Sequence, residues 1–313
     1  MSITAVRPMY WAIFGAVVLL SLLLDRAVFG GPKPRVSFRE ALIRSVFFVC
    51  VGLGFGAVIW VAEDGNLNAV FTYLLAYVVE ESLSVDNLFV FLVLFTYFRV
   101  TEAQQQRVLV WGIAGAIVMR AVFIFLGSEL LHRFQWMIFV FGGFLLVTGA
   151  RLLFKKDEEV NPEDNIALKL ARRYLRTTTE TNGDKFFIVK DGRRYATPLF
   201  LVLVVVEFTD LLFAVDSVPA VLAISNDVFV VYTSNIMAIL GLRALYFLLA
   251  GMMSRFQYLG TGLAVILILI GAKMVASPYF HVSSLHSLVA IGAVLAIAVI
   301  ASLLKSPKQS EQE

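Results

Sequence analysis

Long apolar stretches recur from one end of the chain to the other, separated by short polar breaks. About 20 apolar residues in a helix are enough to cross the roughly 30 Å hydrocarbon core of a bilayer. The composition agrees, because 59% of the 313 residues are hydrophobic and 16% are charged, against roughly 45–50% and about 25% in soluble domains. The sequence therefore predicts an all-α polytopic membrane protein.

The apolar runs between the polar breaks predict about nine transmembrane helices. Their approximate ranges are 10–29, 42–62, 70–97, 108–127, 134–154, 198–224, 229–250, 257–276 and 284–304. Lys and Arg gather after the first, third and fifth of these spans, whereas acids follow the second and sixth. By the positive-inside rule, the N-terminus would lie outside the cytoplasm and the C-terminal tail inside it. The first span is too long for the apolar part of a signal peptide and has no Ala-x-Ala site after it, so we expect it to be retained.

Charge and cysteine content limit the possible partners. The formal net charge of +3 is too small to predict a nucleic-acid partner, and the basic residues lie in the breaks between spans, where topology explains them. Cys50 is the single cysteine, so an intrachain disulfide is impossible.

An internal repeat organises the chain. "RAVFIFLG" from Arg120 matches "RALYFLLAG" from Arg243, "RFQ" occurs at Arg133 and Arg255, and "SVDN" matches "AVDS". These landmarks recur in one order and predict two three-helix units, which would cross the membrane in opposite directions because three spans separate them. Transporters with such an inverted-topology repeat bind their substrate near the midplane. The predicted divisions are two spanning helices in 1–69, the first repeat in 70–154, a cytoplasmic loop in 155–197, the second repeat in 198–276, and the last spanning helix and cytoplasmic tail in 277–313.

The predicted loop 155–197 mixes acids and bases. It is typical of a short helix followed by two strands that turn at Asp191-Gly192. A solvated connector is the simplest interpretation, and a regulatory or partner-docking segment is the alternative.

Carboxylates occupy two equivalent apolar spans. A charge at the centre of a spanning helix costs about 2.5–3.5 kcal/mol and usually marks an ion or proton path. Two groups six residues apart lie about 120° apart on a regular helix, so a shared face would need a helix break, for which Pro219 is a candidate. The six acids are Glu80, Glu81, Asp86, Glu207, Asp210 and Asp216.

The residues beside these acids indicate what the spans could bind. Asn87 and Ser217 follow the two aspartates and add oxygen atoms, and an all-oxygen set favours hard cations such as Mn²⁺, Mg²⁺ or Ca²⁺. Glu81 points about 100° away from Glu80 on a helix, so we expect one of the two to face the ion, and Glu80 is the one that matches Asp210 in the repeat. Polar contacts between helices, without transport, are the alternative. The predicted metal-binding residues are Glu80, Asp86, Asn87, Glu207, Asp210, Asp216 and Ser217.

Two arginines lie inside the fourth and seventh predicted spans at repeat-equivalent positions. Arg120 and Arg243 are predicted charge partners that neutralise the acids when no ion is bound. Buried structural pairs, or side chains that reach the interface, are the alternatives. Asn235 in the seventh span could support the site or join helices.

Three motifs carry a resemblance to a known family. "VVEESLSVDNLFVF", "EFTDLLFAVDSVPA" and "FFIVKDGRRYATPL" resemble the TerC/Alx family of integral membrane proteins, within the wider LysE-like exporter group, from about Tyr77 to Ala276. The resemblance implies a bacterial inner-membrane protein associated with manganese export and tellurite resistance, with its metal site at the residues named above. A close relative has a basic residue at the position of Glu81, which argues against Glu81 as a ligand.

The acidic repeat predicts a cation transporter that works by alternating access, with protons as a coupling ion. The resemblance implies Mn²⁺ as the ion and export as the direction. The partners of such a transporter would be the divalent cation and the lipid bilayer, with no nucleic acid, no tightly bound cofactor and no enzymatic activity. A membrane enzyme with paired aspartates is one alternative, although the chain has no Gly-x-Gly-Asp motif. A stress or metalation partner that acts through residues 155–197 without transport is the other.

Overall fold

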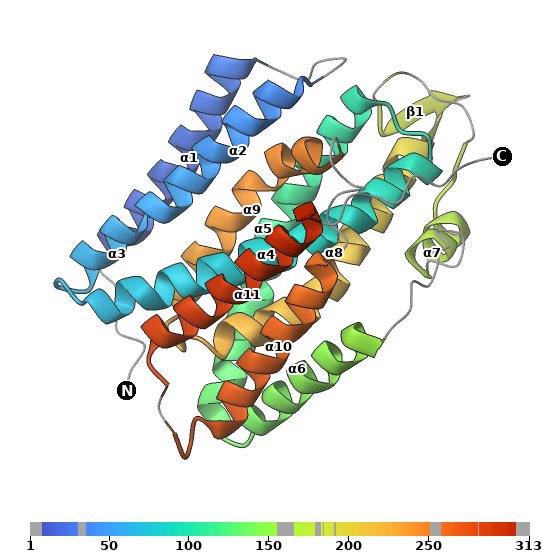
Figure 1. Ribbon diagram of the computed structural model, residues 1–313. Coiled ribbons are helices and arrows are strands. Elements are labelled where there is room, and N and C mark those ends of the chain that lie inside the picture. Colours follow the sequence, from blue (N-terminus) through green and yellow to red (C-terminus); the bar gives the residue numbers. More distant parts are fainter. Residues whose placement is uncertain are drawn as a thin grey trace.

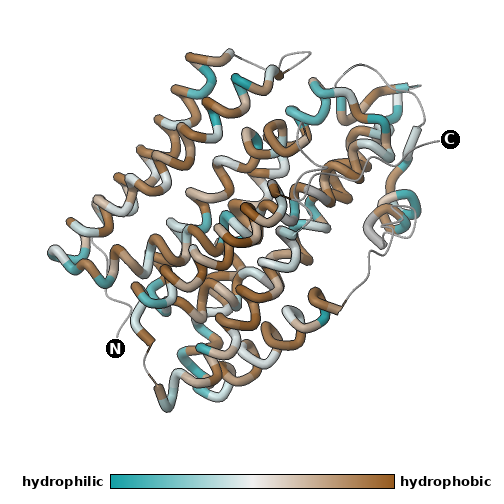
Figure 2. The backbone as a smooth tube through the Cα atoms, in the orientation of Figure 1, coloured by the Kyte–Doolittle hydropathy of each residue, from teal (hydrophilic) through white to brown (hydrophobic). Residues whose placement is uncertain are grey.

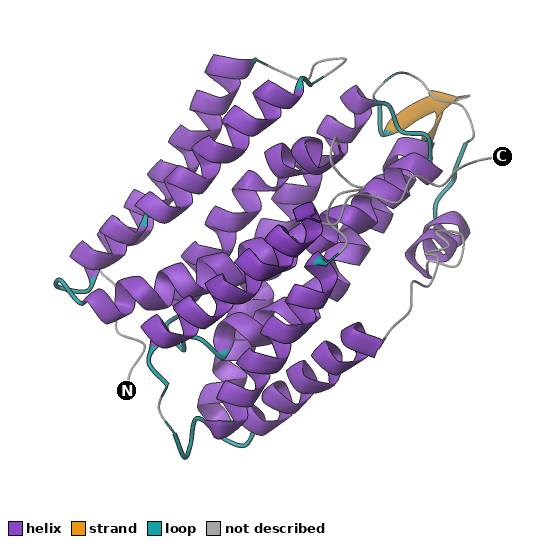
Figure 3. Cartoon of the chain, viewed as in Figure 1, coloured by secondary structure: helices purple, strands orange, loops and turns teal. Residues whose placement is uncertain are grey.

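A computed structural model describes residues 8–30, 36–154, 166–178, 183, 185–190, 192–250, 258–280 and 282–304. In these ranges the chain is almost wholly helical, with one two-stranded sheet (Figures 1 and 3). The elements are α1 Pro8–Phe29, α2 Phe38–Gly54, α3 Gly56–Ala62, α4 Leu67–Tyr97, α5 Glu102–Arg133, α6 Met137–Phe154, α7 Ile166–Tyr174, β1 Phe187–Lys190, β2 Arg193–Ala196, α8 Pro198–Leu222, α9 Val228–Ala250, α10 Leu259–Ala276 and α11 Ser284–Leu304.

Seven helical segments in the described part of the chain are long and apolar enough to cross a membrane. They are α1, α2 together with α3, α5, α6, α8, α9 and α11. The predicted all-α polytopic class is therefore confirmed. The count of about nine is not confirmed, because α10 qualifies only as a shorter apolar helix and α4 is outside the set.

Burial divides the helices into a central and an outer group. In α9, 83% of the apolar window is buried, compared with 17% in α1 and in α11. The outer helices expose large side chains such as Leu19, Leu126 and Ile297, and Figure 2 shows hydrophobic residues along their length. An apolar surface of this extent suits contact with lipid. Polar residues of α9 consequently face other helices rather than the bilayer.

Helices α6 and α10 approach closely through glycines. A Cβ added at Gly142 would lie 3.1 Å from the Gly271 carbonyl oxygen, and one at Gly149 would lie 2.8 Å from that of Ala264. Small residues let helix backbones approach in this way. When the "RFQ" motifs are aligned, Gly142 corresponds to Ala264 and Gly149 to Gly271, so the two contacts exchange places between repeats.

Two other helix pairs follow the same exchange. Helix α4 packs on α9, and α5 packs on α8, so each repeat's first helix meets the other repeat's second helix. A twofold relation would produce this pattern. The inverted repeat itself stays a prediction.

The expected helix breaks are absent from the described backbone of α4 and α8. Both helices are continuous through Asp86 and Pro219. Pro219 lies in the last turn of α8, where the Ala223 amide still donates to its carbonyl at 2.9 Å, so the missing proline N–H costs one bond without interrupting the helix. The prediction of broken helices is therefore wrong, and any site must be assembled from different helices.

The segment between α6 and α8 contains the predicted short helix and hairpin. Leu168 and Ala171 of α7 are buried, and α7 packs on α8. Strands β1 and β2 are antiparallel, and Gly192 between them has φ +70°, a conformation that glycine adopts without strain. Asp191 and residues 155–165 lie outside the described residues.

Candidate functional site

A buried ion pair lies between α4 and α5. Glu80 and Arg120 are both 0% exposed, and Arg120 Nη1 donates to Glu80 Oε1. Asn235 Nδ2 of α9 donates to Glu80 Oε2 at 2.9 Å, and Ser84 Oγ donates to Oε1 at 3.3 Å. A buried carboxylate is tolerated when it is paired and hydrogen-bonded in this way. The Glu80 carboxylate is thus held entirely within the protein.

Arg120 connects Glu80 to the second acidic helix, α8. Its Nη1 also donates to Ser217 Oγ at 3.2 Å and to Asn235 Oδ1 at 3.1 Å, and its Nη2 lies 3.7 Å from Asp210 Oδ1. Glu80 and Asp210, which the repeat predicts as equivalents, therefore share one guanidinium group. Two carboxylates against one guanidinium leave this group of side chains with one net negative charge when both acids are ionised.

One carboxylate oxygen of Asp210 accepts no hydrogen bond from a described group. Its side chain is 8% exposed, and its Oδ2 has no hydrogen-bond partner among the described residues. Burial of an oxygen without a donor is costly, and such atoms in native proteins call for a water or ion that satisfies them. Asp210 Oδ2 is consequently a candidate contact for a cation.

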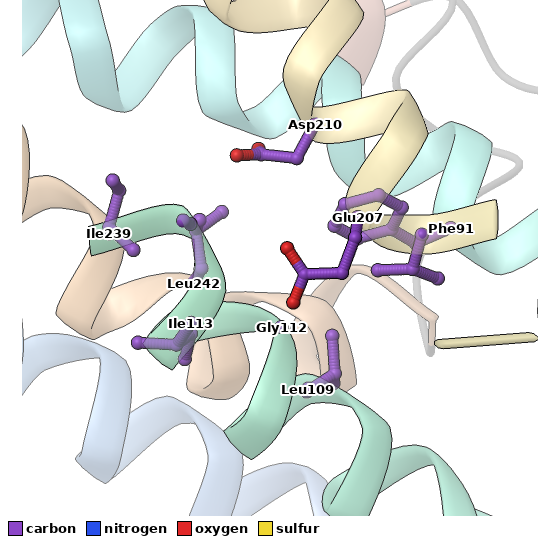
Figure 4. A pocket seen from close by; sticks show the side chains of 10 residues that line it. Phe91, Leu109, Gly112, Ile113, Glu207, Asp210, Ile239 and Leu242 are labelled. Carbon is purple, nitrogen blue, oxygen red and sulfur yellow. The ribbon is translucent and has the colours of Figure 1, made fainter. Parts of the chain in front are cut away.

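Glu207 lies one turn before Asp210 on α8. Figure 4 shows both carboxylates pointing into the same cavity, a space of about 20 Å³, which is enough for roughly one water molecule or ion. Its walls are otherwise apolar and include Phe91 of α4, Leu109 of α5 and Leu242 of α9. Two acids in an apolar cavity favour a positively charged occupant.

Glu81 faces away from this group. A Cβ added at Gly241 of α9 would lie 3.7 Å from Glu81 Oε1, and Tyr77 is the polar neighbour that interacts with the Glu81 carboxylate. Neither Glu81 oxygen accepts a hydrogen bond from a described group within ordinary geometry. The structure thus groups Glu80, and not Glu81, with residues of the second motif, in line with the sequence-based expectation.

Three predicted ligands have no described place in the cluster. The side chains of Asp86 and Asp216 lie outside the described residues, although both backbones are helical. Asn87 is 5% exposed and lies one residue after Asp86 on α4. Among the side chains that the structure describes, no three of His, Cys, Asp or Glu gather closely enough to hold a metal. The full predicted ligand set therefore stays a prediction.

Arg243 has a different partner from the expected one. It donates through Nη2 to Asp25 Oδ2 of α1, and Arg44 of α2 lies 3.6 Å from Asp25 Oδ1. Arg44 also pairs with Glu40 at 2.8 Å. The structure therefore pairs Arg243 with Asp25, contrary to its expected pairing with the repeat acids, because α1 brings a carboxylate to it that the repeat does not contain.

Sequence reasoning overlooked Asp25, Arg44 and Ser84. Asp25 was visible as an acid within the apolar run "LSLLLDRAVF", the same signal that identified the other acids. No signal in the sequence pointed to its arginine partner, because that contact joins residues 218 positions apart.

The arrangement around Arg120 can hold one positive charge among oxygen atoms inside the helix bundle. The oxygens come from two carboxylates, an amide and a hydroxyl, on α4, α8 and α9. These are the donor types that bind hard cations. A guanidinium fills this space in the described conformation.

Comparison with known families gives one match. The model described as "Integral membrane protein TerC family" matches residues 66–311. That range includes every predicted site residue. No solved structure matches the chain significantly.

Curated relatives are similar over nearly the whole chain. "Uncharacterized membrane protein STKORF319" of Myxococcus xanthus is 44% identical over 301 residues, which cover 96% of this chain and 93% of the relative. The "Putative membrane-bound redox modulator Alx" of Escherichia coli strain K12 is 42% identical over 304 residues, covering 95% of both proteins. The protein of the same name from Photorhabdus laumondii is 42% identical over 300 residues, covering 94% of both.

Proposed function

This chain belongs to the TerC family of integral membrane proteins, and on that basis we propose that it is a transporter that exports a hard divalent cation, with manganese as the ion. The multi-pass architecture and the bacterial relatives support a membrane location. Within the proposal, the protein lies in the inner membrane with its N-terminus outside and its C-terminus in the cytoplasm. It acts as a transporter and not as an enzyme.

The observation that supports transport most directly is the buried guanidinium between the two acidic helices. Arg120 is 0% exposed and interacts with both Glu80 and Asp210. One positive charge leaves two ionised carboxylates undercompensated, whereas a divalent cation in the same place would balance them. Exchange of Arg120 for the metal would thus replace an undercompensated state of these acids with a balanced one.

The ligand chemistry supports a hard ion. Asn235 Oδ1 and Ser217 Oγ already lie within hydrogen-bond distance of the Arg120 guanidinium. If Arg120 moves away, these oxygens and the carboxylates form an oxygen-only set, which suits Mn²⁺, Mg²⁺ or Ca²⁺. Asp86 and Asp216 would add charge from the same two helices. The choice of manganese, and protons as the coupling ion, come from the family resemblance and from the cost of ionised acids in a membrane.

The name of the curated Alx relatives suggests a redox function. This chain has one cysteine, Cys50, which is exposed, so a thiol–disulfide cycle within one chain is unavailable. The buried acidic group instead favours metal transport. A stress or metalation partner without transport remains the alternative that the experiment below separates.

The test is metal flux into proteoliposomes under an imposed pH gradient. We expect wild-type protein to move Mn²⁺. Asp216→Ala should lower the initial rate at least about tenfold, because the variant removes a charge from the proposed ion path. Mg²⁺ and Ca²⁺ in parallel rank the cations, and removal of the gradient tests proton coupling.

A matched control is available at the bundle surface. Glu129 is an exposed acid paired with Arg133 at 2.8 Å, so Glu129→Gln should transport at the wild-type rate. If wild-type protein moves no metal, or if Asp216→Ala equals Glu129→Gln, the transport proposal is wrong.

A further inference from the structure

We propose that the cation binds Glu207 and Asp210 in a separate outer binding step, on the cavity side of Arg120. Gly115 is the positioning residue that leaves the Glu207 side chain room to face this cavity. This inference rests on the proposed transport function and deepens it. It divides the predicted single acidic site into an outer pair of acids and an inner group around Arg120.

The cavity lies on one side of the Arg120 cluster. Its lining residue Phe91 is near the C-terminal end of α4, and Leu109 precedes Arg120 near the N-terminal end of α5. Glu207 likewise precedes Asp210 on α8. These helix ends adjoin the segment that carries α7 and the hairpin (Figure 1), as the hydrogen bond between α5 and that segment also shows. An ion from that side would meet Glu207 first and Asp210 second.

Charge distinguishes the outer acids from the inner group. Arg120 pairs with Glu80 and approaches only Oδ1 of Asp210, which leaves Oδ2 buried without a partner among described groups. No described cation forms an ion pair with Glu207. The cavity therefore has an uncompensated carboxylate at Glu207 and a free oxygen at Asp210, both facing one space (Figure 4).

Gly115 of α5 sets the direction of the Glu207 side chain. A Cβ added at Gly115 would collide with the Glu207 carboxylate, meeting Oε1, Oε2 and Cδ closer than real side chains approach. Any larger residue would consequently push the carboxylate out of its place. Gly143 of α6 is different, because a Cβ added there would meet nothing within 4 Å. The two glycines thus differ in what an added methyl group would touch.

This difference gives a matched pair of variants. Gly115→Ala should displace the carboxylate and raise the KM for Mn²⁺ flux about tenfold with kcat changed less than about twofold, because it weakens capture of the ion. Gly143→Ala makes the same chemical change on α6, which contributes no residue to the cavity, and should keep the wild-type KM. Glu207→Gln, which removes the charge without added volume, should raise KM as Gly115→Ala does.

Rescue separates positioning from packing. Glu207→Asp shortens the side chain by one methylene, so Gly115→Ala combined with Glu207→Asp should recover a KM within about threefold of Glu207→Asp alone. The readouts are initial Mn²⁺ flux over a concentration series in proteoliposomes and thermal unfolding of each variant in detergent.

The outcomes separate the two proposals. Wild-type flux with an unchanged KM in Gly115→Ala and Glu207→Gln would overturn the outer binding step and leave the transport function intact. Equal defects in Gly143→Ala and Gly115→Ala, or no rescue by Glu207→Asp, would assign Gly115 to helix packing and overturn its positioning role. Absence of flux in wild-type protein would instead contradict the transport function itself.

Discussion

Arg120 and Arg243 occupy equivalent places in the two predicted repeats, yet their surroundings differ. Arg120 is fully buried and interacts with Glu80 and Asp210, one acid from each repeat. Arg243 pairs with Asp25 of α1, and its side chain is 21% exposed. The first arginine therefore contacts the acids of the candidate site, whereas the second contacts a helix outside both repeats.

The comparison shows that a repeat in sequence does not require equal contacts. Helices α1 and α2 precede the repeats and cover α9, to which they contribute Asp25 and Arg44. This addition gives Arg243 a local partner and leaves Arg120 as the arginine that the described acids of both repeats contact. Under the proposed function, the Arg120 cluster would carry the transport chemistry, whereas the Arg243 cluster joins α1 and α2 to α9.

The largest expected effect comes from removal of the principal acid in each cluster. Glu80→Gln should cost about 3–5 kcal/mol of stability, because it strands a buried guanidinium, and should abolish Mn²⁺ flux. Asp25→Asn should cost less, because Arg243 is partly exposed, and should keep most of the flux. Thermal unfolding in detergent and proteoliposome flux measure both. Loss of flux in Asp25→Asn with normal flux in Glu80→Gln would reverse the assignment of the two clusters.

The arginines themselves give the second test. Arg120→Gln should reduce flux about tenfold or more while Mn²⁺ binding in detergent persists, because the oxygen ligands stay but the competing cation is gone. Arg243→Gln should change both quantities less than about twofold. Calorimetric Mn²⁺ binding and flux assays check this expectation. It fails if Arg120→Gln transports normally.

A smaller effect is expected from the peripheral acids. Asp210→Asn keeps the Arg120–Glu80 pair but removes the carboxylate 3.7 Å from Nη2, and Glu40→Gln keeps the Asp25 contacts but removes the partner 2.8 Å from Arg44. Both should cost about 1–2 kcal/mol or less. Only Asp210→Asn should weaken Mn²⁺ flux, so equal flux in both variants would contradict the distinction between the clusters.

The smallest effect is expected at Glu63, which serves as a reference because no arginine is among the groups that shift its pKa. Burial first, and then the charges of Asp227 and Asp64, raise the pKa of Glu63 above its ordinary value of 4.5. A raised carboxyl pKa contributes stability that is fully present below about pH 4.5 and is lost as pH rises through the folded-state pKa. Glu63→Gln should therefore lose less stability than wild type between acidic and neutral pH, with a difference in Tm below about 2 °C.

Thermal unfolding at pH 4.5 and at pH 7 measures this difference. A larger loss in Glu63→Gln than in wild type on going to neutral pH would show that the carboxylate is stabilised by a cation. Glu63 would then resemble the acids of the two arginine clusters.

Several parts of the fold follow from pattern alone. Apolar run lengths predicted the helical membrane class, and the sequence around Asp191-Gly192 predicted the hairpin of β1 and β2. The match with Asp210 in the predicted repeat favoured Glu80 over Glu81, and the structure groups Glu80 with Asp210 and Ser217, whereas contact of Glu80 with an ion stays a prediction. These predictions depend on local spacing, which a sequence displays directly.

Two other predictions failed, one for a local reason and one because of packing between distant segments. Pro219 suggested a broken helix, but its place in the last turn of α8 allows the helix to continue. The repeat suggested that Arg243 contacts acids as Arg120 does, but α1 supplies Asp25 instead. Nothing in the spacing of residues within the repeats could reveal a partner contributed by a helix outside them.

By itself, the sequence determined that this protein is a helical membrane protein with acids in two equivalent apolar helices, because hydrophobic length and the cost of buried charge are properties of each segment. Only the tertiary structure decided which arginine meets those acids, and that Gly115 leaves space for Glu207 beside Asp210. Such contacts depend on how α4, α5, α8 and α9 pack together. The residues are far apart in the chain, so their distances are set by the whole bundle rather than by any local pattern.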